Sequence, residues 1–176
     1  MTAIPVEPTR RDLLHIATAA VAATGAAAAT WPLVAQMNPG ASTLAAGAPV
    51  DVDLAAIAIG QVIKVVWRGQ PYFISHRTEK QIEEARAADW QSLRDPQPDS
   101  ERVKAGREQW LVVSAVCTHL GCIPTDHQGD YDGWFCQCHG SQYDSSGRAR
   151  KGPAPRNLPL VAYKFVSDAI IRIGEA

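Results

Sequence analysis

Cysteine is absent from this 176-residue chain before Cys117 and after Cys138, so all of its four cysteines lie within one short stretch. Such crowding excludes a disulfide framework spread over the whole fold and indicates one local site. A strong excess of either charge is missing as well, since the formal net charge is −1. A near-neutral chain gives no electrostatic reason to expect nucleic acid as a partner.

Charged side chains are also missing between Leu13 and Val34. As a helix, a run of this length would extend over about 33 Å and could span the hydrocarbon core of a bilayer. Arg10 and Arg11 precede the run, and no Lys or Arg follows it until Lys64. Because cationic residues stay on the cytoplasmic side, we expect a single-pass anchor with its N-terminus in the cytoplasm.

The arginine pair stands in Thr9-Arg10-Arg11-Asp12-Leu13-Leu14, which resembles a twin-arginine export signal. That route carries proteins that are already folded. Two other interpretations remain, a cleaved signal peptide and a buried helix of a soluble protein. The small residues Ala46-Gly47-Ala48 could permit cleavage.

Composition divides the chain into three parts. All four tyrosines, and every tryptophan except Trp31, lie after residue 66, whereas the first fifty residues are rich in alanine. We therefore expect an N-terminus and anchor over 1–37, a flexible hinge linker over 38–49 and a globular domain over 50–176. Small residues, glycine and proline dominate the linker segment, as in chains with flexible and stiff parts.

The globular part is predicted to be mainly β and antiparallel, with one inserted helix. Thr78 and Gln81 form a capping box for a helix from Glu79 to Arg94, and Asp95-Pro96 would end it. Short runs rich in β-branched and aromatic residues are typical of strands. The expected strands are 61–67, 71–75, 110–116, 161–166 and 169–173.

Two cysteine–histidine motifs carry the chemistry of the chain, Cys117-Thr-His119 and Cys136-Gln-Cys138-His139. Two sulfur and two nitrogen ligands favour a 2Fe-2S cluster with both histidines on one iron. A Cys2His2 zinc site is one alternative, but it would leave two cysteines unused. An all-cysteine cluster is another, although the cysteine spacing does not match ferredoxin patterns and both histidines would lack a role.

The two cysteine–histidine motifs resemble those of a known family. Cys117-Thr-His-Leu-Gly-Cys122 and Cys136-Gln-Cys-His-Gly-Ser141 resemble the two boxes of the Rieske iron–sulfur proteins. Lys151-Gly-Pro-Ala-Pro-Arg-Asn-Leu158, here called the proline loop, is similar to that of the members in ubiquinol–cytochrome c reductase. The likeness covers nearly the whole chain and implies a Rieske-type β domain with cluster-binding loops at about 115–158. One departure is Gln137, where the family usually has proline.

The resemblance also implies a role for each site residue. Cys117 and Cys136 would bind one iron, and His119 and His139 the other. A disulfide would join Cys122 to Cys138, as suits neighbouring thiols in an oxidising compartment. Ser141 and Tyr143 would donate hydroxyl hydrogens to cluster sulfur. Both histidines and Leu120 would form a quinol-facing, proton-coupled tip. Gly152, Pro153 and Pro155 would belong to a loop that covers the cluster.

The implied function is that of the iron–sulfur subunit of a quinol–cytochrome c oxidoreductase. The subunit would take an electron from ubiquinol at cytochrome b and pass it to a cytochrome c1-type partner, in a dimeric complex of three main subunits. Its anchor would lie in a bacterial inner membrane with the cluster domain in the periplasm, and it would not complete a catalytic cycle alone. Alternatives are a subunit of an exported oxidase of the arsenite oxidase type, an oxygenase ferredoxin and the related plastoquinol–plastocyanin reductase.

Overall fold

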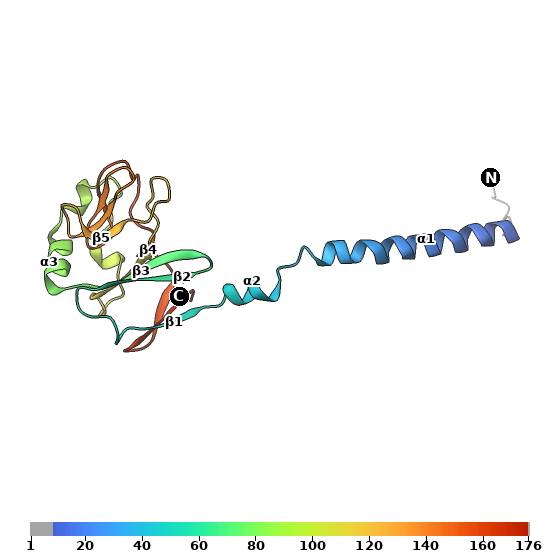
Figure 1. Cartoon of the computed structure of the whole chain (residues 1–176), viewed down its shortest axis with the longest axis horizontal. Helices are drawn as coiled ribbons and strands as arrows, with labels where there is room; N and C mark the ends of the chain where they lie inside the picture. Colours follow the sequence, from blue (N-terminus) through green and yellow to red (C-terminus); the bar gives the residue numbers. More distant parts are fainter. Residues whose placement is uncertain (1–8, 176) are drawn as a thin grey trace, which may run out of the picture. The chain divides into compact units, whose positions relative to one another are not determined.

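The computed structural model describes residues 9–175, so the first eight residues of the N-terminus predicted to be cytoplasmic lie outside the described residues. The chain divides into two compact units, Met1–Ala45 and Ala46–Ala176. Figure 1 shows the helices of the first unit and the strands of the second.

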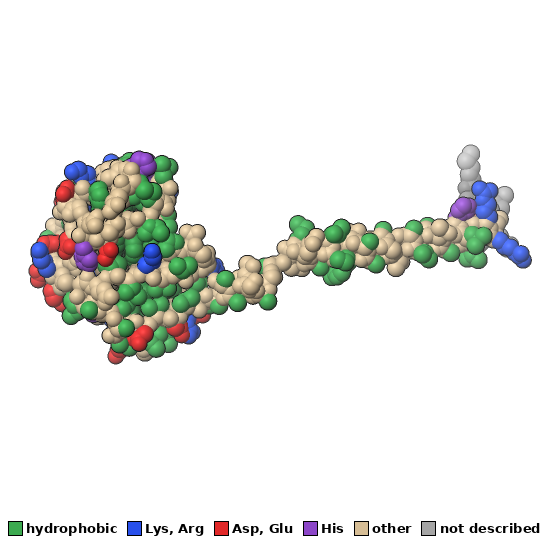
Figure 2. Space-filling view, in the orientation of Figure 1, with side chains coloured by type: hydrophobic (Ala, Val, Ile, Leu, Met, Phe, Trp, Pro, Cys, Tyr) green, Lys and Arg blue, Asp and Glu red, His purple; other side chains and the backbone are tan. Residues whose placement is uncertain are grey.

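The first unit is dominated by one helix, α1 (Arg10–Ala35). A capping box starts it, in which the Thr9 hydroxyl accepts from the Asp12 N–H at 3.3 Å and the Asp12 carboxylate accepts from the Thr9 N–H at 2.9 Å. An 18-residue window of this helix has a mean hydropathy of 1.5, and its charged side chains lie only in the first turn (Figure 2). The helix is long and apolar enough to cross a membrane, as predicted.

A short helix, α2 (Ala41–Ala46), lies within the segment predicted as a linker, where we expected no helix. Alanine has the highest helix propensity of any residue, which accounts for the local preference. No residue of α2 is buried. Helices of this length are marginal without tertiary packing, so α2 is held by local preference alone.

The last linker residues are bonded to the domain that follows. The indole N–H of Trp67 donates to the Ala48 carbonyl at 2.9 Å, and Nε of Arg68 donates to the Gly47 carbonyl at 3.2 Å. The Arg68 guanidinium lies 4.5 Å from the centre of the Trp67 ring. Residues 47 and 48 are therefore fixed to the turn of the first hairpin.

The domain contains three antiparallel sheets (Figure 1), whose strand orders are β1-β10-β9, β2-β3-β4 and β5-β6-β7-β8. The strands are β1 (Val50–Asp53), β2 (Val62–Trp67), β3 (Gln70–His76), β4 (Trp110–Ser114), β5 (Thr125–Gln128), β6 (Gly133–Cys136), β7 (Ser141–Tyr143), β8 (Ala149–Lys151), β9 (Tyr163–Ser167) and β10 (Ile170–Ile173). The strands expected at 61–67, 71–75, 161–166 and 169–173 are confirmed, and they pair as the antiparallel hairpins β2–β3 and β9–β10. The mainly antiparallel β fold is therefore as predicted.

The strand β4 separates two hydrophobic cores, because successive side chains of a strand point to opposite faces. Val113 packs in the core that holds Trp134 and the free cysteines. Val112 belongs to the other core, with Ile171 of β10. The sheet β2-β3-β4 thus lies between the other two, and its one face supports the loops that carry the cysteine motifs.

The inserted helix, α3 (Glu79–Ala87), is shorter than predicted. Its capping box between Thr78 and Gln81 is confirmed, but the helix ends at Ala87, with Ala88 as its C-cap, and not at Arg94. The carbonyl of Ala85, in the last turn, accepts a hydrogen bond from Nη2 of the buried Arg148 at 2.8 Å. The Arg148 side chain thus satisfies a main-chain carbonyl that would otherwise accept from the next turn of a longer helix. Two 3-10 turns follow the helix, η1 (Trp90–Ser92) and η2 (Asp99–Glu101).

A buried ion pair fastens the insertion to the domain. Nη1 of Arg77 lies 2.6 Å from Oδ1 of Asp99, and the side chains are 0% and 2% exposed. The hydroxyl of Ser146, from the loop after β7, donates to the same carboxylate. The insertion, which runs from α3 to η2, is therefore bonded directly to the loop between β7 and β8.

Candidate metal centre

The two cysteine motifs stand on loops of similar local geometry. The first loop follows β4 and the second joins β6 to β7. In each, the cysteine carbonyl accepts from a glycine N–H four residues later, Gly121 to Cys117 at 3.0 Å and Gly140 to Cys136 at 2.9 Å. Each loop thus curls back on its own cysteine.

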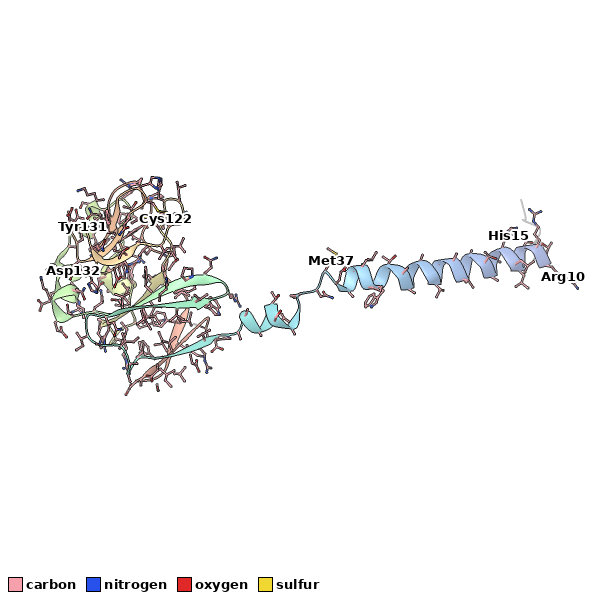
Figure 3. The ribbon with its side chains drawn as sticks, in the orientation of Figure 1. Arg10, His15, Met37, Cys122, Tyr131 and Asp132 are labelled. Carbon is pink, nitrogen blue, oxygen red and sulfur yellow. A yellow bond between two sulfur atoms is a disulfide. The ribbon has the colours of Figure 1, made fainter. Side chains whose placement is uncertain are left out.

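A disulfide joins the two loops. The Cys122 and Cys138 sulfurs are 2.16 Å apart and bonded, which confirms the predicted pairing. Figure 3 shows Cys122 in the part of the domain that lies opposite β1. The Cys136 sulfur lies within 4.8 Å of both disulfide sulfurs. Only Cys136 of these three can offer a thiolate, because the other two are bonded to each other.

Four donor groups, two thiols and two imidazoles, converge on this end of the domain. Cys117 and Cys136 are free thiols, each only 2% exposed. The rings of His119 and His139 have centroids 4.7 Å apart and meet edge to face at 86°. His119 is half-buried and His139 is exposed. Two sulfurs thus lie inside and two imidazoles outside, a donor set that suits a cluster with two chemically different irons.

The two free thiols differ in their electrostatics. Burial raises the pKa of Cys117, but the Tyr143 hydroxyl and the backbone N–H of His119 outweigh it, so the pKa lies below its ordinary value. At Cys136, burial and the neighbouring Cys117 thiol raise the pKa. Cys117 is therefore the readier thiolate, and a bound cation would hold both sulfurs deprotonated.

Tyr143 supports the first loop from inside the core. Its hydroxyl lies 3.2 Å from the Cys117 sulfur and accepts from the Thr118 N–H at 3.2 Å. Burial raises the pKa of Tyr143, so the phenol keeps its proton and can donate it to the sulfur. Thr118 was not predicted as a site residue, and its hydroxyl also donates to the Arg156 carbonyl at 2.6 Å.

The proline loop lies directly on the second cysteine loop. Gly152 has a φ of +89°, and a Cβ there would lie only 2.6 Å from the Ser141 Cα, so no other residue fits. The N–H of the buried Ala154 donates to the Ser141 hydroxyl oxygen at 3.1 Å. Pro153 and Pro155 are exposed on either side of Ala154.

The surface beside the histidines is apolar. Leu120 is 72% exposed, and Ile123, which sequence reasoning did not single out, is 50% exposed. Leu120 follows His119 directly and Ile123 lies three residues further along, so the first cysteine loop presents two apolar side chains to solvent. Gln137 lies on the second loop, and its side-chain amide donates to the Gln128 side chain at 3.4 Å, so the departure from proline adds a link to β5.

Comparison with known proteins gives two family matches. Residues 93–163 match the family described as "Rieske [2Fe-2S] domain". Residues 1–40 match the family described as "Ubiquitinol-cytochrome C reductase Fe-S subunit TAT signal".

Proteins with similar sequences carry names that agree with these two family matches. The chain is 68% identical over 167 residues to the ubiquinol-cytochrome c reductase iron-sulfur subunit of Bradyrhizobium diazoefficiens, covering 95% of each chain. It is 62% identical to the subunit of the same name from Blastochloris viridis, over 96% of this chain and 94% of that one. Among solved structures, a chain of a hyperthermophilic respiratory Complex III aligns with a TM-score of 0.57 and 25% identity, over 89% of this chain and 98% of that one.

Proposed function

Because the chain belongs to the family of ubiquinol-cytochrome c reductase iron-sulfur subunits, with a Rieske domain for one 2Fe-2S cluster, we propose that it accepts one electron from ubiquinol. The electron would come from a quinol bound at cytochrome b, with coupled release of a proton, and would pass to a cytochrome c1-type partner. The subunit thereby contributes to proton translocation by its complex.

The ligands we propose are Cys117 and Cys136 for one iron and His119 and His139 for the other. The observation that carries this assignment is the meeting of the two imidazoles, 4.7 Å apart, above two buried free thiols. The disulfide removes Cys122 and Cys138 as competing ligands. An all-cysteine cluster is therefore disfavoured by the bonding of the cysteines themselves.

When bound, a histidine-ligated cluster supplies a one-electron acceptor of roughly −150 to +300 mV, against about −400 mV for plant-type ferredoxins. The residues around it set the conditions for that chemistry. Tyr143 and Ser141 place hydroxyl groups beside the sulfurs, and donors of this kind favour the more negative, reduced state. The histidines keep a ring nitrogen at the surface that can hydrogen-bond a quinol.

The exposed Leu120 beside the histidines would form part of the apolar rim of the quinol contact. Gly152, Pro153 and Pro155 would cover the cluster from the other side. The apolar helix α1 and the export-signal match fit a membrane-anchored subunit. We propose that its N-terminus lies in the cytoplasm and the domain in the periplasm, since Arg10 and Arg11 precede the apolar run.

One fixed position of the domain could not bring the cluster close to both cytochromes, so we propose that the domain moves on its linker. The linker segment is rich in small residues, and no residue of α2 is buried. Both properties suit a segment that changes shape without breaking a packed core.

Electron paramagnetic resonance on the assembled complex tests this function. Ascorbate, a mild reductant, is expected to produce the signal of a reduced 2Fe-2S cluster, and oxidised ubiquinone analogues at the quinol site should alter its line shape. A sample that is silent after ascorbate and contains zinc instead of iron would overturn both the ligand assignment and the function.

A further inference from the structure

A segment outside the cluster-binding loops, Arg94–Asp95, is bonded to the proline loop at two points. Nη1 of Arg94 donates to the Gly152 carbonyl at 2.9 Å and to the Ala154 carbonyl at 2.7 Å. The Asp95 carboxylate accepts from the Asn157 N–H at 2.9 Å, and its main-chain carbonyl accepts from the Asn157 side-chain amide at 3.0 Å. We call this pair of residues the clasp.

Ala154 connects the clasp to the site. Its carbonyl is bonded to Arg94 on the outer side of the proline loop, and its N–H donates to the Ser141 hydroxyl oxygen at 3.1 Å on the inner side. Because the Ser141 oxygen already accepts this bond, its own hydrogen is left for the cluster sulfur. The orientation of the Ser141 hydroxyl therefore depends on where Ala154 is held.

The far end of the proline loop is fixed in the same way. The side-chain oxygen of Asn157 accepts from the Ala149 N–H at 2.9 Å, which ties the loop to β8. Asp95 holds the other polar groups of Asn157. With both ends bonded, Ala154 has little freedom to move away from Ser141.

We propose that Arg94 and Asp95 are positioning residues, which set the reduction potential of the cluster by holding the proline loop and, through Ala154, the Ser141 hydroxyl. The inference rests on the ligand assignment and on the role of Ser141 proposed above. Neither clasp residue belongs to the cysteine motifs, and both lie more than twenty residues before the first of them.

The charges of Arg94 and Asp95 could also act on the reduction potential directly. Variants of the two residues distinguish this electrostatic explanation from positioning. Removing the cation of Arg94 lowers the potential under either explanation. Removing the anion of Asp95 would raise the potential if charge alone acted, because a more positive surrounding favours the reduced state. Loss of positioning would instead lower it, so the sign of the Asp95→Ala shift distinguishes the two.

The test is a redox titration, followed by electron paramagnetic resonance, of membranes that contain the assembled complex. The variants are Arg94→Ala and Asp95→Ala, each alone and combined with Ser141→Ala. Asp95→Asn keeps an acceptor oxygen without the charge and should rescue the potential. Arg86→Ala is the matched arginine control, since Arg86 is an exposed cation of α3 whose Nη2 lies 3.9 Å from the Glu108 carboxylate and which belongs to neither the clasp nor the proline loop.

We expect both alanine variants to lower the midpoint potential by no more than Ser141→Ala does, and to cause no further fall when Ser141 is already alanine. Arg86→Ala should leave the potential near that of the wild type. Shifts of opposite sign for Arg94→Ala and Asp95→Ala, equal shifts in the Ser141→Ala background, or no shift at all would each overturn the proposal.

Cluster assembly is followed separately by spin quantification. If both alanine variants lose the cluster, Arg94→Lys and Asp95→Glu carry the comparison: both keep the charge but displace the hydrogen bonds, so positioning predicts a lower potential in each and charge alone predicts no shift. If these also lack the cluster, the clasp serves assembly and not tuning, and the proposal is wrong. Failure of the proposed function itself would be visible already in the wild type, as a missing ascorbate-reducible signal.

Discussion

At the scale of single residues, the site is defined by hydroxyl groups next to buried sulfur. Tyr143 is completely buried and lies 3.2 Å from the Cys117 sulfur, and Ser141 is completely buried beneath the proline loop. Buried hydroxyls that donate to a thiolate stabilise its negative charge most when that charge is largest. Both residues should therefore act on the energy difference between the oxidised and reduced states.

We predict that Ser141→Ala and Tyr143→Phe each lower the midpoint potential. A loss of about 1.4 kcal/mol of preference for the reduced state corresponds to a fall of roughly 59 mV for one electron. Redox titration of the complex measures the shift. Tyr163→Phe removes a hydroxyl from the other core and serves as the control. Unchanged potentials in both site variants would remove this role.

At the scale of loops and helices, two links hold the cluster side of the domain together, the disulfide and the Arg77–Asp99 ion pair. The disulfide ties the first cysteine loop to the second. The ion pair ties the insertion to the loop after β7, through Ser146. Each link joins segments that are distant in the sequence, so each should contribute to the stability of the assembled site.

We expect the double variant Cys122→Ser/Cys138→Ser to be less stable by about 3 kcal/mol, because a crosslink over 16 residues restricts the unfolded chain. The measurement is thermal loss of the cluster absorbance, with midpoint temperatures compared between variant and wild type. Equal midpoints would show that the loops are held by their other contacts.

Asp99→Asn should destabilise the domain by about 3–5 kcal/mol, because it leaves the buried guanidinium of Arg77 without its counter-charge. Asp168→Asn is the control, since Asp168 pairs with Arg107 at the surface and is 91% exposed. Loss of a surface pair costs at most about 1 kcal/mol. Denaturant unfolding compares the two, and equal effects would contradict the importance of burial.

The buried Arg77–Asp99 pair also predicts that the stability of the domain depends on pH. Burial opposes ionisation of Asp99, but Arg77 and Ser146 together hold its pKa below the ordinary value of 3.8. A lowered folded pKa means that the stabilisation is complete above about pH 4 and is lost as the pH falls through the folded value. Asp99→Asn should therefore flatten the acid side of the stability curve. Parallel curves for variant and wild type would contradict this assignment.

At the scale of the whole molecule, the proposed function requires a domain that moves on its linker. Thr43→Pro with Ala45→Pro should disrupt α2, stiffen the segment and slow quinol oxidation, while the cluster spectrum stays unchanged. Thr43→Gly with Ala45→Gly is the matched control, because it removes helix preference but adds flexibility. Turnover measured in membranes tests both, and full turnover in the proline variant would make the linker a passive spacer.

The parts of the molecule that could be predicted are those encoded by neighbours in sequence. The cysteine motifs, the capping box at Thr78 and the apolar helix are each complete within a few residues. The end of α3 and the roles of Thr118 and Arg94 could not be predicted, because their partners lie up to sixty-three residues away. No local sequence pattern indicates contacts between residues so far apart in the chain.

The insertion also has a consequence for the order in which the domain folds. A nine-residue helix such as α3 is marginal in isolation. Its stabilising partner Arg148 lies 63 residues after Ala85, whose carbonyl it bonds, and therefore leaves the ribosome later. The insertion can therefore become fully ordered only after the sheet β5-β6-β7-β8 and its loop with Arg148 have formed. Protease resistance of residues 88–98 would then report, during biogenesis, whether the domain is complete enough for a route that exports folded proteins.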